Sequence, residues 1–158
     1  MLCPQPIDLF RCANMKTDLN ITNTPHAVLY TMIRVQDLDR SLRFYCDALG
    51  MTEMRRETFT GAAFTLVFVG YPGSDALIEL TYNWGDNSYS HGTGYGHIAL
   101  EVHDIHQVCT GLSKQGVDIV RAPGPMTMAP DETPEREIIA FVEDPDGYRI
   151  ELIQASSA

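Results

Sequence analysis

The sequence predicts an α+β fold made of two copies of one strand–helix–strand–strand–strand module, and two observations support this prediction. Residues 31–50 (TMIRVQDLDRSLRFYCDALG) align with residues 98–116 (IALEVHDIHQVCTGLSKQG), and each stretch contains a strand, a capping Asp, an amphipathic helix and a terminal Gly. In addition, Glu79 and Glu151 are lone acids at matching places in two otherwise apolar strands. Since internal repeats reveal duplicated architectures, we expect one domain of two similar modules at residues 26–158.

Module one is predicted to span residues 26–84. Its opening strand, at residues 27–35, places Tyr30, Met32 and Arg34 on one face because strand side chains alternate. One amphipathic helix follows at residues 37–50, and then three strands at residues 51–59, 62–71 and 76–83.

Module two is predicted to span residues 95–154, after a polar link at residues 85–94 that is rich in Gly, Ser and Asn. Its opening strand, at residues 95–103, places His97 and Glu101 on one face. The remaining elements are a helix at residues 104–115, a strand at 117–121, a long loop at 123–137 and a hairpin from 138.

The closing hairpin, residues 140–154 (AFVEDPDGYRIELIQ), has a tight turn of Asp-Pro-Asp-Gly, with Pro and Gly where such turns favour them. In the strand that follows, Ile150 and Leu152 point to one side and Glu151 to the other. Because burying an unpaired carboxylate is costly, we expect a cationic group to face Glu151. The same reasoning applies to Glu79 in its own strand.

Length and composition exclude several classes of protein. A chain of 158 residues, 44% hydrophobic and 20% charged, is typical of one globular domain, and no long apolar run could cross a membrane. The formal net charge of -10 argues against nucleic acid or an anionic membrane as a partner, because both require a positive field. An anionic substrate would therefore need Arg or Lys side chains at its binding site.

Four cysteines show no paired spacing, so we expect neither a disulfide framework nor a zinc knuckle: Cys3, Cys12, Cys46 and Cys109. This usage fits a reducing cytoplasm. Residues 1–25 lack the features of a secretory signal, and we expect an irregular N-terminal arm. A strand or helix that covers a neighbouring subunit is the alternative for this stretch.

Four side chains stand at matching places in the two modules: Tyr30 and His97 on the opening strands, and Glu79 and Glu151 on the closing strands. If the opening and closing strands of each module adjoin, two facing modules could bring these side chains together around one divalent cation. Imidazole and carboxylate ligands suit zinc, nickel, cobalt, iron or manganese. The alternative for each residue alone is a hydrogen-bonded core side chain.

Several runs of this sequence resemble glyoxalase I, lactoylglutathione lyase, of the vicinal oxygen chelate superfamily. They are YTMIRVQDLDRSLRFYCDALGM, LVFVGY, LIELTYNWG, YGHIAL and IAFVEDPDGYRIELI, and the likeness covers about residues 28–154. The resemblance implies paired βαββ(β) modules that form a cupped mixed sheet. It also implies a homodimer whose sites lie between subunits, with module one of one chain facing module two of the other.

The resemblance implies that Glu79, His97 and Glu151 are three of four metal ligands. The family's fourth ligand, usually His and sometimes Gln, precedes the Thr-Met-(Leu/Ile)-Arg-Val run, and here that position is Tyr30. Tyr30 could bind the metal only as a metal-stabilised phenolate or by a shift of the ion. The short stretch at residues 85–95 implies nickel, with cobalt or zinc as the other candidates.

Three further residues match substrate-binding positions. Arg34 and Asn83 match contacts to glutathione, the cosubstrate that the resemblance implies, and Arg121 falls where the family often has a basic residue. A surface salt bridge is the alternative for Arg121. Phe64, Leu66 and Phe68 are either an apolar pocket or core, and His103 and His106 are expected to be solvated.

The reaction that the resemblance implies converts the methylglyoxal–glutathione hemithioacetal to S-lactoylglutathione through an enediolate. Glu151 is the expected proton-transfer base, with Glu79 as its counterpart. In the alternative mechanism both acids are only ligands and a metal-bound hydroxide is the base. A second hypothesis, which Tyr30 motivates, is a diverged non-catalytic binding protein on the same fold. Ring-cleaving dioxygenases are disfavoured because they typically need two His and one carboxylate.

Overall fold

The computed structural model describes residues 25–85 and 87–156. The arm expected at residues 1–25 therefore lies outside the described residues, apart from its last residue. Among the helices of the described ranges, none is long and apolar enough to cross a membrane.

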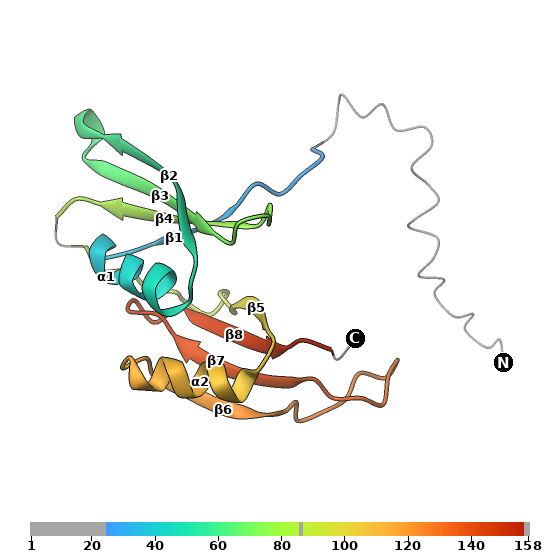
Figure 1. Ribbon diagram of the computed structural model, residues 1–158. Helices are drawn as coiled ribbons and strands as arrows, with labels where there is room; N and C mark the ends of the chain where they lie inside the picture. The colour runs from blue at the N-terminus through green and yellow to red at the C-terminus, as the bar shows by residue number, and fades with distance from the viewer. Residues whose placement is uncertain (1–24, 86, 157–158) are drawn as a thin grey trace, which may run out of the picture.

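The chain folds into two four-stranded sheets, one from each module, which Figure 1 shows as separate layers. Sheet A has the strand order β1-β4-β3-β2 and contains β1 (Thr31–Arg34), β2 (Thr52–Phe59), β3 (Phe64–Gly70) and β4 (Leu77–Asn83). Sheet B has the order β5-β8-β7-β6 and contains β5 (Ile98–Val102), β6 (Ile119–Pro125), β7 (Ile138–Glu143) and β8 (Arg149–Gln154). The predicted duplicated α+β fold is confirmed, and each module has a mixed sheet of its own.

In both sheets the opening strand pairs in parallel with the closing strand. β1 pairs with β4, with Met32 opposite Glu79, and β5 pairs with β8, with Ala99 opposite Glu151. The other neighbouring strands pair antiparallel. The adjacency on which the predicted site depended is therefore present in both modules.

The helices follow their capping signals. The side chains of Asp37 and Asp104 accept hydrogen bonds from the backbone N–H groups of Arg40 and Gln107 and begin α1 (Leu38–Leu42) and α2 (Ile105–Lys114). A short 3₁₀ turn, η4 (Thr60–Ala62), links β2 and β3. Gly116 ends the second helical segment with a φ of 81°, as expected for a glycine stop.

The first helix differs from the regular α-helix predicted at residues 37–50. After α1 it continues as a π-helix, η3 (Arg43–Ala48), in which Leu49 donates to the carbonyl of Phe44. Two consecutive large side chains of this wider turn, Phe44 and Tyr45, are both buried. Hydrophobic spacing alone could not indicate the π-turn, because it reports which residues face the core and not the length of each turn.

Both opening strands are shorter than predicted, since β1 begins at Thr31 and β5 at Ile98. Residues 25–30 are exposed and lie outside the strand. β6 is longer than predicted, because Gly124 and Pro125 still pair with β7 after irregularities in the register.

One hydrophobic core joins the two modules. Module one contributes Val35, Tyr45 and Leu80, and module two contributes Ile105 and Leu152. The alternate residues of β4 and β8, including Glu79 and Glu151, lie on the other faces of the sheets.

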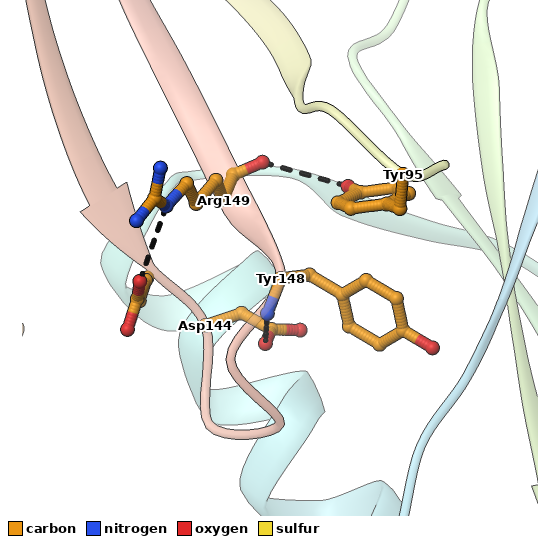
Figure 2. A network of polar contacts seen from close by, with 5 residues as sticks. Tyr95, Asp144, Tyr148 and Arg149 are labelled. Atoms are coloured by element: carbon orange, nitrogen blue, oxygen red, sulfur yellow. Dashed lines mark hydrogen bonds and ion pairs between the residues drawn. The ribbon is translucent and has the colours of Figure 1, made fainter. Parts of the chain in front are cut away.

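The turn of the closing hairpin docks against module one. The Asp144 carboxylate accepts hydrogen bonds from the Tyr45 hydroxyl at 2.9 Å and from the backbone N–H of Tyr148 at 2.8 Å, and Figure 2 shows the latter bond inside the turn. The Tyr148 hydroxyl in turn accepts from the backbone N–H of Arg34 at 3.3 Å. Burial raises the pKa of the Asp144 carboxyl, and burial together with Asp144 raises the pKa of Tyr45.

Candidate metal and substrate site

His97 and Glu151 form the closest pair among the predicted site residues. His97 Nε2 lies 2.9 Å from Glu151 Oε2, which is hydrogen-bond distance. The His97 side chain is 42% exposed and that of Glu151 is 12% exposed, so the pair borders the surface. The ring of Phe141 supports the pair, because it meets the His97 ring edge-on at 5.4 Å between centroids.

Glu79 receives its side-chain hydrogen bond from within its own strand. Its Oε1 accepts a hydrogen bond from the Thr81 hydroxyl at 2.7 Å, and its side chain is buried on the same face of β4. Within the described residues no salt bridge involves Glu79. A hydroxyl two residues along the strand therefore satisfies one oxygen of this carboxylate, and the cationic group expected to face Glu79 stays a prediction.

Tyr30 occupies the place in module one that His97 occupies in module two. Its ring meets Phe68 edge-on at 5.1 Å between centroids, and Phe68 pairs with Glu79 across the strands. Phe68 also contacts Arg55, whose guanidinium lies 3.9 Å from the centroid of the Phe68 ring. Tyr30 is 41% exposed, so its phenol remains open to solvent.

One chain does not bring all the predicted ligands together. Within residues 25–85 and 87–156, no group of three or more His, Cys, Asp or Glu side chains is close enough to hold a metal ion. The donor chemistry of His97 and Glu151 suits a divalent ion, with two adjacent ligands from neighbouring strands. Glu79 would have to come from a second copy of the chain to complete a three-ligand site.

The two predicted substrate-binding residues of module one lie at one edge of sheet A. Arg34 is the last residue of β1 and pairs with Thr81 of β4, and Asn83 is the last residue of β4. Because β1 and β4 are parallel, both residues lie at the same edge of the sheet. Both side chains contact Tyr89 of the link between modules. The Asn83 amide donates to the Tyr89 hydroxyl at 3.1 Å, and the Arg34 guanidinium lies 5.8 Å from the centroid of the Tyr89 ring.

Arg121 is held by its own sheet. Its guanidinium donates to the carbonyls of Ile139 at 2.9 Å and Pro125 at 2.8 Å, and within the described residues it forms no salt bridge. The side chain belongs to the cross-strand row that continues through Phe141 to Glu151. Its substrate-binding role therefore stays a prediction.

The remaining candidate residues differ in how exposed their side chains are. Phe64 and Leu66 are partly exposed on the Glu79 face of sheet A, whereas Phe68 is buried. His103 and His106 are exposed, as predicted for solvated side chains.

Sequence reasoning missed three side chains that organise the site: Thr81, Tyr89 and Phe141. Thr81 could have been found, because it lies two residues from Glu79 and so shares its face of the strand. Phe141 follows from strand pairing once the register is known. Tyr89 lies in the polar link, where no periodicity indicates which way a side chain points.

Comparisons with known proteins show which family this chain resembles. The model of the Glyoxalase/Bleomycin resistance protein/Dioxygenase superfamily matches residues 27–152. The chain is 53% identical over 132 residues to a probable lactoylglutathione lyase of Synechocystis sp., a match covering 82% of this chain and 96% of that relative. It is 47% identical to the lactoylglutathione lyase of Haemophilus influenzae, with 82% and 93% covered.

Solved structures extend the likeness to three dimensions. Glyoxalase I from Zea mays has a TM-score of 0.73 and 35% identity, and the match covers 82% of this chain and 45% of the maize chain, so the chain spans less than half of the maize protein. The trypanothione-dependent glyoxalase I of Leishmania major has a TM-score of 0.67 and 42% identity, with 82% and 87% covered.

Proposed function

We propose that this chain, which belongs to the Glyoxalase/Bleomycin resistance protein/Dioxygenase superfamily, is a metal-dependent lactoylglutathione lyase. Its reaction is the isomerisation of the methylglyoxal–glutathione hemithioacetal to S-lactoylglutathione through an enediolate. The observation that carries the proposal is the His97–Glu151 pair, 2.9 Å apart and open to solvent on one side. The match to relatives bearing the lactoylglutathione lyase name, over 82% of this chain and more than nine-tenths of each relative, supports it.

Glu151 is the proposed base. It removes the proton from the substrate carbon that bears the sulfur and returns it to the adjacent carbon, and a carboxylate at the edge of a ligand set can do both. His97 Nε2 lies 2.9 Å from Glu151 Oε2, which keeps the imidazole and the carboxylate adjacent so that both can serve one ion. The Phe141 ring, edge-on to His97 at 5.4 Å between centroids, packs against the imidazole of the pair.

We further propose that His97, Glu151 and Glu79 hold a divalent metal, nickel in preference to cobalt or zinc. When bound, the metal supplies Lewis-acid stabilisation of the negative charge that develops on the two vicinal substrate oxygens. The Thr81 hydroxyl orients the Glu79 carboxylate by a hydrogen bond of 2.7 Å. Tyr30 is the proposed fourth ligand of this set.

A homodimer with its sites between subunits is part of the proposal, because Glu79 lies outside the His97–Glu151 pair of its own chain. Tyr30 and Met32 are 41% and 47% exposed at β1, an edge strand of sheet A, and a second copy would cover them. Arg34, Asn83 and Arg121 supply the positive and hydrogen-bonding groups for the glutathione carboxylates. A cytoplasmic location completes the proposal, and the thiol groups of Cys46 and Cys109, which are both free, support it.

The test is turnover of the hemithioacetal by purified, nickel-loaded protein. We expect formation of the thioester, and we expect Glu151→Gln to lower kcat by about 10³-fold, because a well-placed base contributes on that order. Glu101→Gln is the matched control, since Glu101 is an exposed acid of the neighbouring strand β5. Hemithioacetals of glutathione and of trypanothione, assayed side by side, identify the thiol.

A second candidate is a non-catalytic binding protein on the same fold, and the observation that favours it is Tyr30 in place of an imidazole. If nickel-, cobalt- and zinc-loaded protein all fail to turn over the hemithioacetal while still binding S-hexylglutathione, this second candidate replaces the first.

A further inference from the structure

Tyr89 is the residue of the link that contacts both predicted glutathione-binding side chains of module one. Arg34 ends β1 and Asn83 ends β4, and these strands are parallel neighbours, so both side chains leave the sheet at the same edge. The Tyr89 hydroxyl accepts from the Asn83 amide at 3.1 Å, while its ring lies under the Arg34 guanidinium at 5.8 Å. No other described side chain makes a hydrogen bond or cation–π contact with both groups.

Contacts of neighbouring residues in the link hold Tyr89 in this place. The Asn87 amide donates to the backbone carbonyl of Asn83 at 2.6 Å and to that of Gly85 at 3.2 Å, which folds the link back onto the end of β4. Two residues beyond Tyr89, the His91 ring stacks on Tyr148 at 4.0 Å between centroids. The Tyr148 hydroxyl accepts from the backbone N–H of Arg34. The link is therefore fixed on both sides of Tyr89.

The chemistry of these contacts leaves binding capacity free. An Asn amide has two N–H donors, and Tyr89 uses one of them. The Tyr89 hydroxyl accepts from Asn83 and keeps its own proton for a further acceptor. The Arg34 guanidinium over the ring has five N–H donors of its own. Guanidinium, amide and phenol thus present donors together, as a carboxylate requires.

We propose that Tyr89 is a positioning residue for the glutathione portion of the substrate, because it holds Arg34 and Asn83 side by side before the ligand arrives. This inference rests on the function proposed above. A free Arg side chain must lose its rotational freedom when it binds an anion, and Tyr89 removes much of that loss in advance. Tyr89 acts on the part of the substrate that does not react, so it affects substrate affinity and leaves the proton transfer unchanged.

The experiment compares Tyr89→Phe, Tyr89→Leu and wild-type protein, all nickel-loaded. Calorimetry measures the Kd for S-hexylglutathione, and steady-state kinetics measure KM and kcat for the hemithioacetal. Removing one hydrogen bond in Tyr89→Phe should raise Kd and KM about fivefold, and removing the ring as well in Tyr89→Leu should raise them about tenfold or more. We expect kcat to stay within twofold of wild type.

Two controls separate positioning from a loss of structure. Tyr71→Phe also removes a tyrosine hydroxyl that makes one hydrogen bond, to the carbonyl of Leu49 at 2.9 Å, and we expect it to leave Kd unchanged. In an Asn83→Ala background, Tyr89→Phe should add less than twofold, because the Tyr89 hydroxyl acts through the Asn83 amide. A merely structural role would instead add its full cost in both backgrounds.

The outcomes distinguish this inference from the proposed function. If wild-type protein neither binds S-hexylglutathione nor turns over the hemithioacetal, both are overturned. If wild-type protein does both and Tyr89→Leu matches it in Kd and KM, only the assignment of Tyr89 is overturned. A fall in kcat with unchanged KM would also overturn it, because Tyr89 would then act on the chemical step.

Discussion

The two modules place equivalent side chains in equivalent rows, and one residue makes the difference between them. In sheet A the row runs from Glu79 through Phe68 to Arg55, and in sheet B it runs from Glu151 through Phe141 to Arg121. Immediately before each opening strand a second ring meets the phenylalanine edge-on, Tyr30 in module one and His97 in module two.

The consequence of this difference lies in what the acid contacts. The imidazole of His97 reaches the carboxylate of Glu151 at 2.9 Å, whereas the carboxylate of Glu79 takes its hydrogen bond from Thr81. The duplicated backbone thus determines where the side chains stand, and the side-chain type determines which of them pair. Four predictions test this difference between the modules, from the largest expected effect to the smallest.

The largest expected effect is a loss of kcat, and it should be larger for Glu151 than for Glu79. Glu151→Gln should lower kcat by about 10³-fold, which corresponds to about 4 kcal/mol of transition-state stabilisation. Glu79→Gln should lower it less, because the Glu79 carboxylate accepts a hydrogen bond from Thr81 and has only the role of a ligand in the proposed mechanism. Steady-state kinetics at saturating nickel measure both variants, with bound metal quantified for each. A larger loss in Glu79→Gln would assign the base to module one.

The second prediction concerns the turns of the closing hairpins, which differ in burial. Asp144→Ala should lower the free energy of unfolding by about 3 kcal/mol, because a buried carboxylate with three donors is lost. Asp75→Ala, in the exposed turn of module one, should change it by less than about 0.5 kcal/mol. Urea unfolding measures both variants. Equal losses of unfolding free energy would mean that the docked turn stabilises the chain no more than the exposed turn does.

The third prediction concerns a substitution that gives module one the imidazole that module two has at His97. Tyr30→His should raise the affinity for nickel about tenfold, because an imidazole is a better neutral ligand for this ion than a phenol that must first lose its proton. Tyr30→Phe is the matched control and keeps the ring against Phe68. Competition with a chelator gives the Kd for nickel. A tenfold loss of affinity in Tyr30→Phe would show that the phenol is itself a ligand.

The smallest effect is a pH dependence at the junction between modules. Burial raises the pKa of Tyr45 above its usual value of about 10, so the folded chain keeps a proton that the unfolded chain releases. The contribution of Tyr45 to stability is therefore complete below pH 10 and declines above it, by about 1 kcal/mol between pH 10 and pH 11.

Tyr45→Phe should remove this decline while lowering stability at neutral pH, because Asp144 then loses a hydrogen-bond donor. The pKa of Tyr95 is raised to about 12, chiefly by burial, and its effect remains in both proteins. Urea unfolding at pH 9, 10 and 11 provides the comparison. Parallel pH curves for the two proteins would contradict the assignment to Tyr45.

Much of the fold could be predicted from the sequence because its signals are local. The caps at Asp37 and Asp104, the stop at Gly116 and the alternation around Glu79 and Glu151 each depend on neighbours a few residues away. The π-turn of η3 and the continuation of β6 were missed, because packing and a distant strand decide them.

The candidate site divides in the same way. The sequence by itself determined that two acids stand in the middle of two strands and that Tyr30 and His97 hold equivalent places, since strand alternation and internal repetition are properties of the chain. Only the tertiary structure decided that His97 pairs with Glu151, that Glu79 turns to Thr81, and that Tyr89 lies between Arg34 and Asn83. Those contacts depend on strand register and on the path of the link, which local sequence signals do not specify.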